Sequence, residues 1–162
     1  MIEKVTTSFR MMYGYIEKDW GTSFPKSYVW CQANNFKEKN TSLFLSIAEV
    51  PFKKVNFKGF ICIFLVEGKE YRFATYNLAK VKNVEVNKDE GIVSIVIKKR
   101  RYKLYINIKR KNDVELIAPN VHGMKKIITE SINSEVIVKL LKGNKLLFEG
   151  FSPNAGLEIV GE

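Results

Sequence analysis

The chain of 162 residues is long enough for one domain with a substantial buried core. Its 46% hydrophobic and 27% charged residues are typical of a soluble globular protein, and it has neither the ~18-residue apolar run of a membrane-spanning helix nor a signal peptide. We therefore expect a cytoplasmic protein. The net charge of +10 is not accompanied by an RNP-like, zinc-finger or helix-turn-helix pattern, so we do not expect the protein to bind nucleic acid.

The N-terminal part of the chain contains two predicted strands, 13–20 and 28–36, whose side chains are unusual for an ordinary core. Because side chains alternate along a strand, Tyr15, Glu17 and Asp19 share one face of the first strand. In the second strand, large aromatic and amide side chains lie opposite small ones. The large ones are Tyr28, Trp30, Gln32, Asn34 and Phe36, and the small ones are Val29, Cys31 and Ala33. This contrast predicts that the larger face lines a cavity.

Strand signals then recur every ~8–12 residues, with turn residues between them. The predicted strands are 42–50, 59–67, 70–77, 81–87, 91–98, 101–110, 134–142, 145–151 and 156–160. In 101–110 we expect Leu104, Ile106 and Ile108 to face inward. Residues 124–132 have helical spacing, but a strand through them is an open alternative. The pattern predicts an all-β antiparallel fold with little helix, closed as a barrel or stacked as a sandwich.

A basic cluster, 98–103, lies between two predicted strands and marks the tip of a hairpin. A solvated turn is the first interpretation. Attraction to an anionic membrane surface is the second, and it would make the protein peripheral to a membrane.

Cysteine and histidine usage limits the chemistry that the chain can perform. Cys31 and Cys62 both fall in predicted strands, and two buried free thiols are favoured over a disulfide. With one histidine, no Cys-x-x-Cys spacing and no glycine-rich phosphate loop, we predict no metal and no cofactor.

Four segments resemble the tocopherol cyclase family: GYIEKDWGTSFP (14–25), YVWCQANNF (28–36), FATYN (73–77) and NAGLEIVG (154–161). A more distant similarity is to carotenoid hydratases. The resemblance covers 13–161 and implies a lipocalin-like, calycin-type β-barrel over 14–162. It also implies a further β domain upstream, with 1–13 as its remnant strand or linker. Apolar surface and a strand edge left open by that missing domain would favour homo-oligomers.

The resemblance also implies a reaction that needs no cofactor, in which a phenol oxygen adds across a trisubstituted alkene of a prenylated quinol. That reaction requires a protonated carboxylic acid and electron-rich aromatic faces that attract positive charge. Asp19 and Glu17 are the candidate acids. The candidate ligand-binding residues are Tyr15, Trp20, Tyr28, Trp30, Gln32 and Asn34.

Several alternatives remain open at this stage. Glu17 and Asp19 could instead make structural hydrogen bonds or surface ion pairs, and Trp30 and Gln32 could pack in a core. The chain could be a cyclase, or a lipocalin-type module that binds a hydrophobic, lipid-like molecule without transforming it. A half-protein that works only with its partner domain is the third hypothesis.

Overall fold

The computed structural model describes residues 14–18, 25–52, 55–87, 89–120 and 123–161. This part of the chain is built almost entirely of β-strands, which confirms the predicted all-β class. One turn of 3-10 helix, η1 (Thr75–Asn77), follows the fourth strand. The strands are β1 (Tyr28–Ala33), β2 (Ser42–Phe52), β3 (Val55–Val66), β4 (Lys69–Ala74), β5 (Lys80–Asn87), β6 (Ile92–Lys99), β7 (Tyr102–Lys109), β8 (Val114–Asn120), β9 (Gly123–Ser131), β10 (Glu135–Lys142), β11 (Lys145–Ser152) and β12 (Gly156–Val160).

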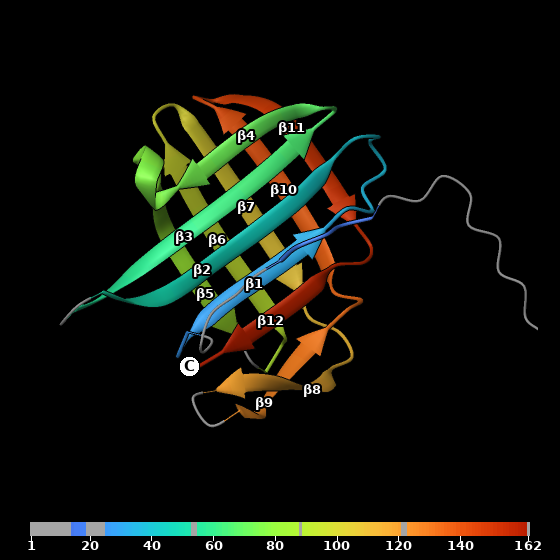
Figure 1. Ribbon diagram of the computed structural model, residues 1–162. Coiled ribbons are helices and arrows are strands. Elements are labelled where there is room, and N and C mark those ends of the chain that lie inside the picture. The colour runs from blue at the N-terminus through green and yellow to red at the C-terminus, as the bar shows by residue number, and fades with distance from the viewer. Residues whose placement is uncertain (1–13, 19–24, 53–54, 88, 121–122, 162) are drawn as a thin grey trace, which may run out of the picture.

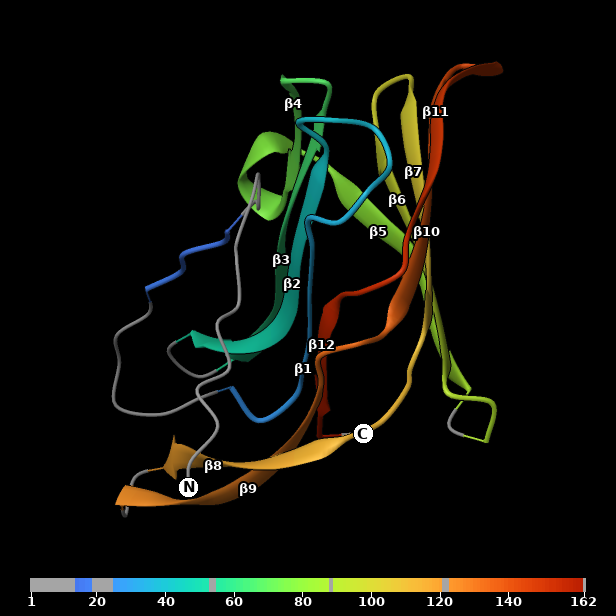
Figure 2. The same ribbon diagram turned by 90° about the vertical axis from the view of Figure 1, so that its right-hand side faces the viewer.

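The strands form two antiparallel sheets that face each other (Figures 1 and 2). The seven-stranded sheet has the order β4-β3-β2-β1-β12-β9-β8, and the five-stranded sheet has the order β11-β10-β7-β6-β5. The strands of one sheet cross those of the other, as Figure 1 shows. The predicted lipocalin-like antiparallel fold is therefore confirmed, with the described strands divided between two sheets around one core.

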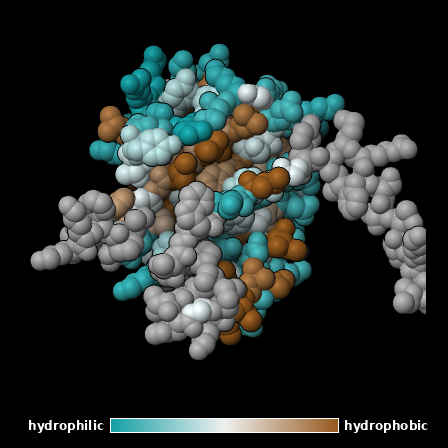
Figure 3. All heavy atoms as spheres, in the orientation of Figure 1, coloured by the Kyte–Doolittle hydropathy of each residue, from teal (hydrophilic) through white to brown (hydrophobic). Residues whose placement is uncertain are grey.

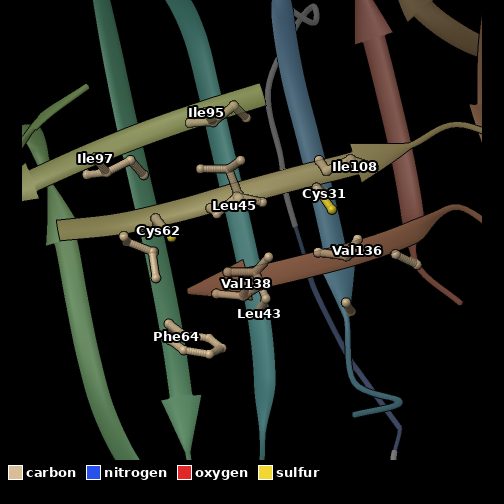
Figure 4. Packing of buried hydrophobic residues seen from close by; sticks show 14 of the residues in the cluster. Cys31, Leu43, Leu45, Cys62, Phe64, Ile95, Ile97, Ile108, Val136 and Val138 are labelled. Carbon is tan, nitrogen blue, oxygen red and sulfur yellow. The ribbon is translucent and has the colours of Figure 1, made fainter. Parts of the chain in front are cut away.

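Apolar side chains from both sheets fill the space between them (Figure 4). Side-chain alternation places every second residue of strands such as β6, β7 and β10 in this core, so Leu104, Ile106 and Ile108 face inward as predicted. Three aromatic rings pack edge to face at one end of the core, with centroids 5.2 Å apart for Phe64–Phe148 and 6.2 Å apart for the two pairs with Phe36. The labelled side chains that meet across the core are Cys31, Leu43, Leu45, Cys62 and Phe64 from one sheet and Ile95, Ile97, Ile108, Val136 and Val138 from the other.

Both cysteines are free and buried in this core. Leu45 on β2 pairs with Cys31 on one side and with Cys62 on the other, so a whole strand separates the two thiols. Strands lie ~4.8 Å apart, which places the two Cα atoms beyond the range that a disulfide bridges. Burial raises the pKa of Cys31 to about 12, so the thiol stays protonated and inert.

The structure differs from the sequence-based expectation in three segments. Residues 14–18 belong to no strand, which corrects the strand predicted over 13–20, whose remaining residues lie outside the described part. Residues 124–132 form most of β9 rather than a helix, so the strand alternative is correct. β8 was not predicted. It is an edge strand with a register shift beside Pro119, a position where proline is tolerated.

The basic cluster lies at the turn between β6 and β7, where the hairpin was predicted. Arg100 has a φ of 53°, the left-handed conformation of a tight turn, and Arg100 and Arg101 are both exposed. In the described part of the chain no helix is long and apolar enough to cross a membrane.

Candidate functional site

The large side chains of β1 point away from the core, to the outer face of the seven-stranded sheet. Val29, Cys31 and Ala33 are the buried inner residues, and Trp30 and Gln32 are half-buried on the opposite side. Figure 3 views this outer face and shows hydrophobic residues gathered on it beside hydrophilic ones. Phe36 was expected on the same face, but β1 ends at Ala33, and the chain then turns Phe36 into the core.

Residues 14–18 lie against this outer face and bring Glu17 to Trp30. The indole Nε1 of Trp30 donates a hydrogen bond of 3.0 Å to Oε2 of Glu17, and the hydroxyl of Tyr15 donates one of 2.9 Å to the same oxygen. The Tyr15 ring stacks on Phe44 of β2 with 5.9 Å between centroids. These two donors on one oxygen hold the Glu17 side chain in place against the sheet.

A cavity of about 340 Å³ lies beside this carboxylate, between residues 14–18 and strands β1, β2 and β3. Its wall is mostly apolar, and Tyr15, Glu17 and Gln32 contribute the polar atoms together with Ser42. The side-chain Nε2 of Gln32 is buried and has no hydrogen-bond partner among the described residues. A buried amide without an acceptor costs about 1–3 kcal/mol, which a bound hydroxyl or carbonyl oxygen would recover. The residues lining the cavity are Tyr15, Ile16, Glu17, Gln32, Ser42, Leu43, Phe44 and Ile63.

Two further carboxyl groups lie on the same face, on β9 and β12. Strand pairing places Glu158 next to both Trp30 and Glu130, and the hydroxyl of Tyr28 donates a hydrogen bond of 2.6 Å to Oε2 of Glu158. Burial, and then the negative charge of Glu158, raise the pKa of Glu130 above its ordinary value. Burial and the same carboxylate also raise the pKa of Tyr28, which keeps its proton for this hydrogen bond.

Trp30 lies between Glu17 and Glu130. Its Nε1 points to Glu17, while its six-membered ring lies over Gly156, where an added Cβ would be 2.8 Å from Cζ3 of the ring. The same Cβ would be 3.6 Å from Oε1 of Glu130, so this carboxyl borders the far edge of the indole. An electron-rich ring with a carboxyl group at each end is an environment that stabilises a cation.

A model of the tocopherol cyclase-like family matches residues 2–161, nearly the whole chain. The chain belongs to the tocopherol cyclase-like family. No curated protein and no solved structure gives a significant match.

The structure brings together four of the residues that the sequence predicted for a tocopherol cyclase-like site: Tyr15, Glu17, Trp30 and Gln32. Tyr28 lies on the same face but contacts Glu158, and Asn34 lies beyond the end of β1. Asp19 and Trp20 lie outside the described residues. Among the described residues no group of three or more metal-ligating side chains occurs.

Glu130 and Glu158 were missed from the sequence. Glu158 stands late in an apolar run, a position where a carboxylate is typical of the protein surface. The sequence feature that could have identified Glu158 is its position in NAGLEIVG, one of the segments that resemble the tocopherol cyclase family.

We expect Gly156→Ala to displace the Trp30 ring and to cost about 1–3 kcal/mol of stability, because the new methyl group would overlap the ring. Trp30 emission is measured in a Trp20→Phe background, since the chain has two tryptophans. A red shift should accompany the loss of the Trp30–Glu17 hydrogen bond. Gly14→Ala is the matched control, because nothing lies within 4 Å of its Cβ position. Unchanged emission in the Gly156→Ala protein would contradict this placement of the indole.

Proposed function

We propose that this chain is a cofactor-free cyclase that closes a ring on a prenylated quinol or a related isoprenoid. One observation carries the proposal: the Glu17 carboxylate, held by Trp30 and Tyr15, borders an apolar cavity on the outer face of the seven-stranded sheet. Membership of the tocopherol cyclase-like family supports the reaction class.

The reaction is an isomerisation and needs no co-reactant. A carboxylic acid protonates one carbon of the alkene, a tertiary carbocation forms at the other, and the phenol oxygen bonds to it and then loses its proton. We assign the proton donor to Asp19. The ionised Glu17 stabilises the cation and accepts the phenolic proton, so the two carboxyl groups have opposite tasks.

The remaining groups orient the substrate and stabilise charge. The rings of Tyr15 and Trp30 face the developing cation. The unpaired Nε2 of Gln32 donates a hydrogen bond to a quinol oxygen, and the apolar wall formed by Phe44 and Ile63 receives the prenyl chain.

A second candidate function is the binding of a hydrophobic molecule without chemistry. The unsatisfied Gln32 amide beside an apolar wall favours it as well. In either case the ligand would lie on the outer face of the seven-stranded sheet, where Gln32 and Glu17 line the cavity.

The test is incubation of the chain with a hydroquinone that carries a prenyl chain next to a hydroxyl group. The product should have the mass of the substrate and a new ring, resolved by chromatography and mass spectrometry. Glu17→Gln should lower turnover by about 10²–10³, the usual effect of removing one electrostatic contact to developing charge.

Glu90→Gln is the control, because Glu90 is exposed in the turn after β5. Binding of the hydroquinone without product would refute the cyclase and support the binding module. Full turnover by the Glu17→Gln protein would remove Glu17 from the mechanism.

A further inference from the structure

A second cavity, of about 280 Å³, lies at one end of the core, between the two sheets. It is separate from the outer face of the seven-stranded sheet, because strands of both sheets line it. Val86 and Val93 from β5 and β6 contribute apolar wall on one side, and Ile159 of β12 does so on the other. Its polar lining comes from Asn87 and Arg110.

Arg110 is fixed in the wall of this cavity by its own backbone and by one carboxylate. Its N–H donates a hydrogen bond of 2.7 Å to the carbonyl of Gly91, and its Nε donates one of 2.7 Å to Oδ1 of Asp113. The side chain is only 23% exposed. Its Nη2 is buried and has no acceptor among the described residues.

A shielded guanidinium nitrogen without an acceptor is costly, since its desolvation is not recovered by a hydrogen bond. An anionic oxygen beside it would recover that cost through a charge-assisted hydrogen bond. Asn87 supplies a second donor on the same wall: its Oδ1 accepts the backbone N–H of Glu90, which leaves its Nδ2 for a ligand.

We propose that this cavity binds a small amphipathic monocarboxylate, such as a medium-chain fatty acid. The carboxylate bonds to Arg110 and Asn87, and the alkyl chain lies against Val86, Val93 and Ile159. The cavity favours a ligand with a single negative charge. Asp113 already neutralises part of the Arg110 charge and would repel the additional charge of a phosphate or diphosphate. This site is independent of the proposed cyclase reaction.

Titration calorimetry of the whole chain with octanoate tests the proposal, with 1-octanol as the uncharged analogue and inorganic phosphate as the anion without a chain. Octanoate should bind at least about tenfold more tightly than either one. Arg110→Gln should weaken octanoate at least about tenfold, whereas Lys82→Gln, at an exposed position of β5, should not change it. Each tenfold change in the dissociation constant corresponds to ~1.4 kcal/mol of binding free energy.

Asp113→Asn changes an exposed side chain and leaves Arg110 with its full charge, so it should fold and should tighten octanoate binding. This variant preserves the test if Arg110→Gln fails to fold. The proposal is overturned if octanoate does not bind, if octanol or phosphate binds as well as octanoate, or if Asp113→Asn weakens octanoate.

Discussion

Replacement of Phe64 by alanine is expected to lower the free energy of unfolding by about 3–5 kcal/mol, the range for large aromatic side chains in a packed core. Phe64 is completely buried in β3. Its ring contacts those of Phe36 and Phe148 edge to face, so its removal leaves a cavity bordered by two rings that cannot both move into it. Such a loss is a large fraction of the ~5–15 kcal/mol that stabilises a typical domain.

Urea unfolding followed by circular dichroism measures this change. Phe151→Ala is the matched control, since Phe151 is 45% exposed on β11. This substitution should lower the free energy of unfolding much less than Phe64→Ala does. The three rings come from β3, from β11 and from the loop after β1. A loss below about 1 kcal/mol for Phe64→Ala would show that this aromatic cluster does not hold the two sheets together.

The fold class could be predicted because most strands alternate apolar and polar residues, as 102–109 does. The alternation in β1 was harder to interpret, because both of its faces carry apolar atoms. Only pairing across the sheet decides which face is inside: Cys31 is in register with Leu45, and Leu45 with Cys62, so the small side chains belong to the core. Small inner residues let the sheets approach closely, and the large ones are left for the outer face.

The candidate site could be predicted only in part, because half of it depends on pairing between distant strands. Glu17 and Trp30 fall in the segments that resemble the tocopherol cyclase family. Glu130 could not be placed while 124–132 remained open between helix and strand. Once this segment is β9, its pairing with β12 puts Glu130 beside Glu158 and close to Trp30.

The proton donor can be identified with two isosteric variants. Asp19→Asn is expected to lower turnover of a prenylated hydroquinone by about 10²–10⁴, the usual contribution of a general acid, because an amide keeps the shape of the side chain but does not donate a proton to an alkene. Glu130→Gln is the matched variant, since Glu130 is a carboxyl group on this face whose pKa is raised by burial and by the charge of Glu158. It should stay within about tenfold of the original turnover.

Glu130→Gln should also change how stability depends on pH. Burial and the charge of Glu158 raise the pKa of Glu130 above its ordinary 4.5, so the folded state binds this proton more tightly than the unfolded state. The resulting stabilisation is fully present below the ordinary pKa and is lost as pH rises through the raised one. Glutamine is neutral throughout, so the variant should be more stable than the original chain at neutral pH and similar to it in acid.

Urea unfolding at neutral and acidic pH measures this difference, and the turnover assay is run on the same preparations. A variant that is less stable at neutral pH would show that the Glu130 carboxylate stabilises the fold. If Glu130→Gln loses about 10²–10⁴ of turnover while Asp19→Asn keeps it, the acid is Glu130. The proton would then reach the alkene from the β9 edge of the Trp30 ring, with Glu17 at the opposite edge to receive the phenolic proton.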